Sequence, residues 1–76
     1  MFYDAEMIDW MEKHGFVSEG VRYVNADRKV AISILSKPEL KTKSAFTIYN
    51  MGDARKSIVM KNFWKMIRKA TNIDLV

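Results

Sequence analysis

The sequence predicts a small α+β domain in the order α-β-β-β-α, with a three-stranded antiparallel sheet covered by two helices on one face. Two patterns support this prediction: apolar residues recur at helical spacing near both ends of the chain, and they alternate along its middle. The composition agrees with it, because 49% of the residues are hydrophobic and 29% are charged. A chain of 76 residues supports one domain, which we expect to span residues 1–76.

The first helix is expected to begin after Asp4 and to end at about Lys13, because Asp4 is a favourable N-cap residue. Gly15 is well placed to end this helix in a left-handed conformation. The histidine that precedes it interacts favourably with a helix C-terminus, so we expect a structural role for this side chain. One face of the helix collects Tyr3, Met7, Trp10, Met11 and His14 at helical spacing.

Two strands are expected at residues 21–24 and 28–35, joined by a tight turn at residues 25–27 into an antiparallel hairpin. The second strand places Val30, Ile32 and Ile34 on one face. A polar connection leads to a third strand at residues 45–49, in which Phe46 and Ile48 share a face.

A second helix is expected over residues 54–71, with Asp53 as its N-cap. Its core-facing stripe has residues at spacings of three and four, flanked by Val59 and Met66. This stripe consists of Met60, Phe63, Ile67 and Ala70.

The net charge of +4 is unevenly distributed along the chain. Residues 1–20 hold five acidic and one basic side chain, whereas residues 28–76 hold eleven basic and three acidic side chains. Such an asymmetry indicates a polyanionic partner. The alternative is that the acidic and basic segments lie side by side and partly neutralise each other.

The second predicted helix carries a basic stripe, in which Lys61, Lys65 and Arg68 recur at spacings of four and three and Asn72 follows four residues later. Such a stripe neutralises phosphates, and Trp64 or Tyr49 would stack on a base. A plain solvated helix face is the alternative interpretation. The predicted contacts with nucleic acid, or with an acidic protein surface, are Arg55, Lys56, Lys61, Trp64, Lys65 and Arg68, extended by Lys41 and Lys43 in the loop at residues 37–43.

The expected order of elements resembles that of double-stranded RNA-binding domains, whose second helix begins with a basic cluster. Gly52 followed by Arg55 and Lys56 is similar to that start. The turn at residues 25–27 departs from the family, because the corresponding loop of these domains is longer and contains glycine and histidine. The resemblance therefore covers the order of elements and no specific motif.

Catalytic chemistry is not expected, and neither is a cofactor or a metal. The chain has no cysteine, one histidine and no glycine-rich phosphate loop. The carboxylates of Glu6, Asp9 and Glu12 are typical of a solvated helix surface. A domain of this size also has little room for a ligand cleft of roughly 300 Å3 or more.

A second function class is a stoichiometric inhibitor of the virus or phage type, which binds and modulates a host protein. Interface cores favour aromatic residues, methionine and arginine. The strands at residues 21–24 or 45–49 would offer an exposed edge to a partner strand or to a second copy in a homodimer. The candidate anchors are Phe2, Tyr3, Trp10, Tyr49 and Trp64.

The N-terminal residues lack the basic region and the apolar stretch of a signal peptide. No apolar run approaches the ~18 residues of a transmembrane helix. We therefore expect a soluble cytoplasmic protein that makes no membrane contact.

Overall fold

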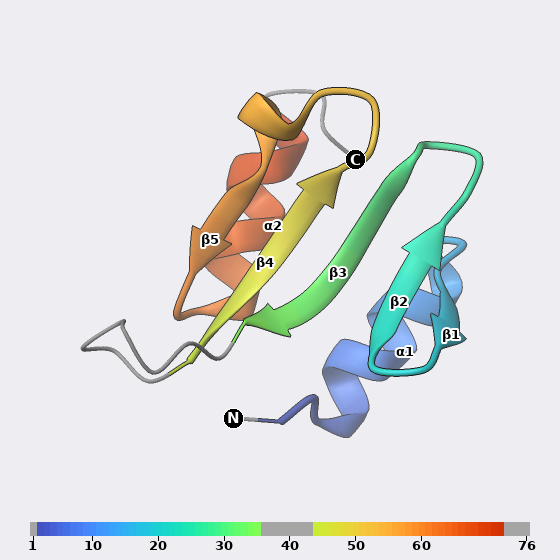
Figure 1. Cartoon of the computed structure of the whole chain (residues 1–76). Coiled ribbons are helices and arrows are strands. Elements are labelled where there is room, and N and C mark those ends of the chain that lie inside the picture. The colour runs from blue at the N-terminus through green and yellow to red at the C-terminus, as the bar shows by residue number, and fades with distance from the viewer. Residues whose placement is uncertain (1, 36–43, 73–76) are drawn as a thin grey trace.

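The computed structural model of this chain describes residues 2–35 and 44–72, which form two helices and a five-stranded antiparallel sheet (Figure 1). The helices are α1 (Ala5–Lys13) and α2 (Phe63–Asn72), and a short 3-10 turn, η1, covers Ala54–Lys56. The strands follow one another in the sheet in chain order: β1 (Val17–Glu19), β2 (Arg22–Asn25), β3 (Val30–Leu35), β4 (Ala45–Asn50) and β5 (Ile58–Met60). The predicted α+β class is confirmed, whereas the predicted number of strands and their order are wrong.

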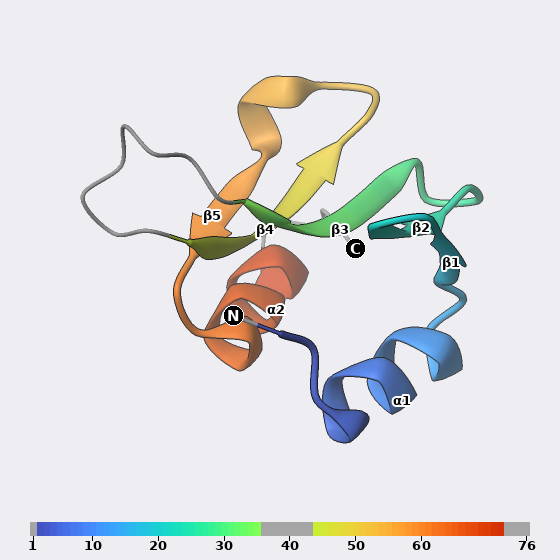
Figure 2. The same cartoon turned by 60° about the horizontal axis from the view of Figure 1, so that its bottom comes forward.

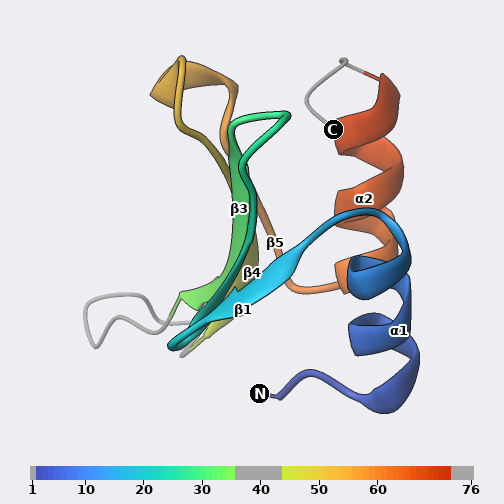
Figure 3. The same ribbon diagram turned by 90° about the vertical axis from the view of Figure 1, so that its right-hand side faces the viewer.

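The domain has two layers. Figure 3 shows the sheet edge-on with α1 and α2 on the same side, and Figure 2 shows the two helices next to each other beneath it. On the other side of the sheet, no helix of the described part of the chain covers the strands. The sheet therefore has one face in the core and one uncovered face.

The single helix predicted over residues 54–71 is wrong, because a strand interrupts it. β5 pairs with β4 in the register Phe46–Met60, Thr47–Val59 and Ile48–Ile58. Alternation along β5 buries Ile58 and leaves Val59 on the uncovered face, where it is 51% exposed. The helix then begins at Phe63, because the side-chain oxygen of Asn62 accepts the Lys65 N–H at 3.0 Å and caps it.

β1 is the other strand that the sequence interpretation missed. It pairs with β2 through a two-residue loop, Gly20 and Val21, between the paired residues Glu19 and Arg22. Gly20 has φ +64, the positive value that the first position of such a tight hairpin loop requires.

Two short strands form the edges of the sheet. β1 and β5 have three residues each and flank the segments at residues 21–24 and 45–49. The prediction that those two segments offer free edges is therefore wrong, because both lie inside the sheet. Short edge strands present few unpaired backbone groups to another chain.

The predicted β2–β3 hairpin is confirmed, although β3 begins at Val30 and not at residue 28. Ala26 to Lys29 form the turn, in which the Lys29 N–H donates to the Ala26 carbonyl at 3.2 Å. Lys29 takes the left-handed φ of 57° that closes the turn. Arg28 thus belongs to the turn and not to the strand.

The core lies between the sheet and the two helices. Its largest fully buried side chains are Met11 from α1, Val30, Ile32 and Ile48 from the sheet, and Phe63 and Met66 from α2. The predicted ends of α1 are confirmed: Asp4 accepts the Met7 N–H at 2.9 Å, and Gly15 has φ +85. Trp10 is half-buried and packs against this core.

The resemblance to double-stranded RNA-binding domains is not supported by the observed order of elements. The chain runs α-β-β-β-β-β-α over the described residues. Arg55 and Lys56 lie in η1, a three-residue 3-10 turn before β5, and not at the start of the last helix.

Neither described helix is long and apolar enough to cross a membrane.

Candidate functional site

The outward side of α2 forms a compact basic surface. A helix turns by about 100° per residue, so its buried residues (Phe63, Met66, Ile67 and Ala70) define one side. The opposite side exposes Trp64, Lys65, Arg68 and Lys69, which we name the basic face of α2. The sequence of α2 contains no acidic residue, so no carboxylate of the helix itself offsets this charge.

The cations of this face are not engaged in ion pairs within the described part of the chain. The two ion pairs observed there join Lys13 to Asp9 at 3.0 Å and Arg55 to Asp53 at 3.1 Å. Lys69, which the sequence interpretation did not include among the contacts, lies one turn after Lys65 on the same face. Its spacing of four residues from Lys65 was the sequence pattern that could have identified it.

Lys61 lies outside the helix. It occupies the link between β5 and α2 and is exposed. The predicted stripe is therefore shortened: Lys65 and Arg68 are helical, Asn72 is the last residue of α2, and Lys61 precedes the helix. The two predicted loop contacts, Lys41 and Lys43, lie outside the described residues.

The structure does not group Arg55 and Lys56 with Lys61, contrary to the prediction. η1 follows β4, and β5 then carries the chain back along the sheet before Lys61 (Figure 1). The two parts of the predicted basic surface are thus separated by the length of β5. The two parts would bind the same ligand only if that ligand spans the distance between them.

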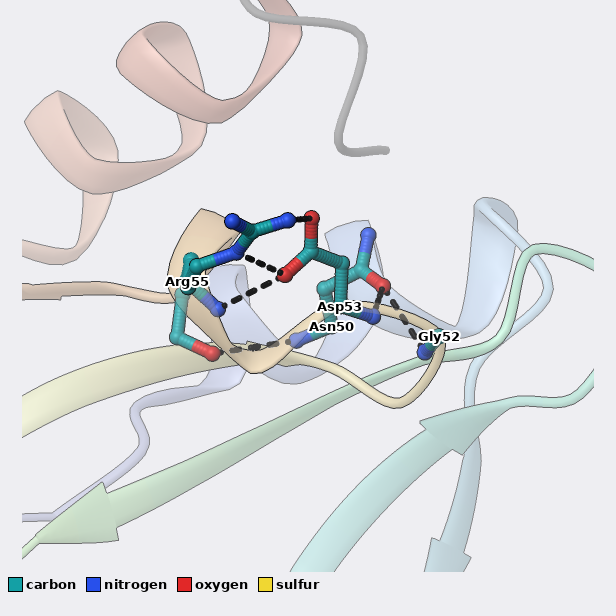
Figure 4. Close-up of polar contacts among 5 residues, drawn as sticks. Asn50, Gly52, Asp53 and Arg55 are labelled. Carbon is teal, nitrogen blue, oxygen red and sulfur yellow. Dashed lines mark hydrogen bonds and ion pairs between the residues drawn. The ribbon is translucent and has the colours of Figure 1, made fainter.

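Arg55 is also held by a neighbouring carboxylate (Figure 4). Asp53 Oδ1 accepts the backbone N–H and the Nε–H of Arg55, each at 3.1 Å, and Oδ2 accepts from Nη2 at 3.3 Å. The hydrogen bond from the Arg55 side chain, followed by the one from its backbone, lowers the pKa of Asp53 from 3.8. Asn50 Oδ1 fixes this turn by accepting the N–H groups of Gly52 and Asp53 at 2.8 and 2.7 Å. Arg55 is therefore a weaker candidate than the cations of α2.

The two candidate stacking residues lie on opposite sides of the molecule. Trp64 is 38% exposed on α2, and its ring meets Phe63 edge-on with centroids 5.0 Å apart. Tyr49 is 45% exposed and alternates with the core residue Ile48 along β4, so it belongs to the uncovered sheet face. Only Trp64 shares a surface with the basic residues of α2.

The acidic residues of the N-terminal segment form a separate surface. Glu6, Asp9 and Glu12 are exposed on α1, which lies on the same face of the sheet as α2 (Figure 2). The ion pairs observed among the described residues do not link α1 to α2. The two helices therefore present opposite charges next to each other.

A groove of about 570 Å3 separates α1 from the C-terminal half of α2. This volume is larger than the sequence interpretation allowed for so short a chain. Arg28 of the β2–β3 turn also lines it. The residues that line it, which we name the α1–α2 groove, are Trp10, Lys13, His14, Arg28, Ile67 and Thr71.

Two neighbouring regions, the basic face of α2 and the α1–α2 groove, thus combine cationic and aromatic side chains. The described residues include no group of three or more histidine or carboxylate side chains that could hold a metal ion.

Comparison of the chain with protein-family models, with curated proteins and with solved structures found no match.

Proposed function

We propose that this protein is a small non-enzymatic binding module that uses the basic face of α2 to bind nucleic acid. One observation carries the proposal. An exposed tryptophan lies among three exposed cations on a helix without an acidic residue, and those cations make no ion pair among the described residues.

The chemistry of the face suits a polynucleotide. Lysine and arginine neutralise phosphates and release condensed counterions, which favours binding at low salt. Trp64 offers a flat surface to an unpaired base, since every base has a π-face that stacks on an aromatic ring. The 10 residues of α2 span ~15 Å, which is enough for several phosphates of one strand.

The other predicted contacts are expected to contribute less to binding than the basic face of α2. Lys61 would extend the face at the start of α2, and Lys56 with Arg55 would contact a longer strand near η1. Lys41 and Lys43 remain predictions, because they lie outside the described residues.

The test is fluorescence anisotropy of labelled single-stranded RNA, duplex RNA and duplex DNA at low and near-physiological salt. We expect tight binding that weakens steeply as salt rises. The double variant Lys65→Glu/Arg68→Glu should abolish it and leave the circular dichroism spectrum unchanged, because both side chains are exposed. Removal of each phosphate-binding cation should reduce the slope of the salt dependence by about one.

A matched control distinguishes the effect of the basic face on binding from the effect of net charge alone. Lys29→Glu changes the charge by the same amount as Arg68→Glu, but in the β2–β3 turn. Arg68→Glu should weaken binding at least tenfold more than Lys29→Glu. Equal effects would show that only net charge matters, and no binding at low salt would refute the proposal.

A second candidate function is the virus- or phage-type inhibitor of a host protein, and the uncovered sheet face favours it. Val17, Tyr49 and Val59 on that face are 63%, 45% and 51% exposed, and aromatic residues are enriched in interface cores. Tyr49→Asp would abolish binding of a protein partner to this face, whereas Arg68→Glu would leave that binding unchanged. The affinity of such a partner would depend little on salt.

A further inference from the structure

The α1–α2 groove offers a binding site next to the basic face of α2. Its volume of about 570 Å3 falls within the range of 300–1,000 Å3 that is typical of small-molecule sites. Trp10 and Ile67 supply apolar surface, whereas Lys13 and Arg28 supply positive charge. Apolar side chains together with positively charged ones suit a ligand that is both planar and anionic.

The aromatic part of the groove is a stacked pair. The rings of Trp10 and His14 lie 4.1 Å apart at an interplanar angle of 17°. The His14 Nδ1 lies 2.8 Å from the Trp10 carbonyl oxygen, which holds the imidazole in this orientation. His14 is exposed, and within the described part of the chain no second aromatic ring stacks on its imidazole. A planar ring placed there would extend the stack.

The charged part of the groove depends mainly on Arg28. Lys13 is held by Asp9 at 3.0 Å, whereas Arg28 makes no ion pair within the described part of the chain. The Arg28 backbone is fixed, because its N–H donates to Asn25 Oδ1 at 3.1 Å. The exposed Arg28 side chain lines the groove, and guanidinium groups pair well with phosphate.

The groove and the basic face share the helix α2. Thr71 lines the groove from the last turn of α2, and Arg68 lies three residues earlier on the same side of the helix. Trp64 lies one further turn away. Trp64, Arg68 and Thr71 thus lie in successive turns of α2, between the basic face and the groove.

We infer that the α1–α2 groove binds one unpaired nucleotide. Its base extends the Trp10–His14 stack and its phosphate pairs with Arg28. The choice of a nucleotide as the occupant rests on the proposed function. The inference adds a preference for single strands, since a base in a duplex is already stacked and paired.

A free nucleotide and a nucleotide within a strand share this chemistry, so AMP serves as the first probe. Amide chemical shifts of the whole chain are followed during titration with AMP, adenosine and inorganic phosphate. We expect AMP to produce saturable shifts at Lys13, His14, Arg28 and Thr71. Adenosine and phosphate should each bind about tenfold more weakly, because each keeps only one of the two contacts.

Variants test the phosphate contact and the base contact separately. Arg28→Ala should weaken AMP binding about tenfold, as the removal of a charged hydrogen bond does. His14→Ala should have a similar effect, whereas His14→Phe should retain binding because it keeps a ring to stack on. Lys29→Ala, in the same turn but outside the groove lining, is the matched control and should leave the AMP affinity unchanged. Unshifted amides in β3 and β4 would show that each variant is folded.

Three results would overturn the inference. They are the absence of saturable shifts at millimolar AMP, shifts confined to the basic face of α2, and equal effects of Arg28→Ala and Lys29→Ala. Each of them would show that the groove does not select a nucleotide.

Binding measurements with oligonucleotides distinguish a failure of the groove inference from a failure of the proposed function. Arg28→Ala should lower the affinity for single-stranded RNA about tenfold and that for duplex DNA much less. Lys65→Glu/Arg68→Glu should abolish binding of both and leave AMP binding intact. AMP binding without any oligonucleotide binding would refute the proposed function and support a site for free nucleotides. Oligonucleotide binding that Arg28→Ala does not alter would refute the groove alone.

Discussion

The side chain of Asn25 joins the end of α1 to the β2–β3 hairpin, because its Nδ2 donates to the carbonyl of His14 at 3.0 Å. Its Oδ1 accepts the N–H of Arg28. Asn25 is 5% exposed, so this one amide connects two residues of the α1–α2 groove from a buried position. The position of His14 relative to Arg28 therefore depends on a side chain outside the groove.

Asn25→Ala should lower the free energy of unfolding by about 1–3 kcal/mol, because it removes a buried side chain and leaves two part-buried backbone groups without their partner. Urea denaturation of the variant and the unaltered protein measures the difference. The amide shifts of His14 and Arg28 should change together. A decrease below about 0.5 kcal/mol, the range of ordinary surface substitutions, would contradict this account.

Gly15→Ala should destabilise the protein more than Gly20→Ala. Both glycines have positive φ, which costs an L-residue about 1–2 kcal/mol. A Cβ added at Gly15 would lie 3.3 Å from Asn25 Nδ2, whereas a Cβ at Gly20 would meet no atom within 4 Å. Thermal unfolding of both variants tests the difference. Equal destabilisation would mean that Asn25 moves aside without cost.

Thr47 connects β4 to β5, and Thr47→Val should weaken that connection. The hydroxyl of Thr47 donates to the Ile58 carbonyl at 3.0 Å and is buried. Its removal should cost about 1 kcal/mol and speed hydrogen exchange at the β5 amides. Thr47→Ser keeps the hydroxyl and should preserve slow exchange there. If both variants exchange alike, the hydroxyl does not stabilise β5.

Arg55→Ala should raise the pKa of Asp53 towards 3.8, because the Arg55 side chain is the first cause of its depression. Since the folded pKa is the lower one, this contact contributes stability above pH 3.8 and ceases to do so as the pH falls through the folded pKa. Carboxyl-detected NMR titration measures the shift. Lys56→Ala is the control and should move the pKa less, because the Lys56 charge is the smallest of the causes.

Trp64→Ala should weaken binding to single-stranded RNA by about tenfold, since stacking on an aromatic ring contributes about 1–3 kcal/mol per base. Binding to duplex DNA should change little, because paired bases do not reach the ring. Trp64→Phe should retain most of the affinity. Anisotropy titrations with both probes measure the effect, and an equal decrease for the two probes would assign Trp64 a packing role only.

The element that the sequence interpretation misread is the segment between Asp53 and Phe63. Met60 continues the helical spacing of Phe63 and Ile67, so one helix accounted for the apolar residues. The preference of Ile58 and Val59 for strands and the capping preference of Asn62 both pointed to β5 and a later helix start. A strand of three residues is too short for alternation to stand out against the helical pattern.

The basic face could be predicted only in its central part. Lys65, Arg68 and Trp64 lie together because they share one short stretch of helix, which spacing alone describes. Arg55 and Lys56 were grouped with them only because the predicted helix was too long. The groove was not predictable, because its residues come from α1, the β2–β3 turn and α2.

The sequence by itself determined α1 with its caps, the β2–β3 hairpin, the inward residues of β3 and β4, and the separation of acidic from basic segments. Each of these follows from local spacing or from a single capping residue. Only the tertiary structure decided the edge strands β1 and β5, because strands of three residues are stable only when a neighbouring strand supplies partners for their backbone groups. The same packing placed α1 beside α2, and the contacts of Asn25 placed the end of α1 against the β2–β3 turn, so that His14 and Arg28 line one groove.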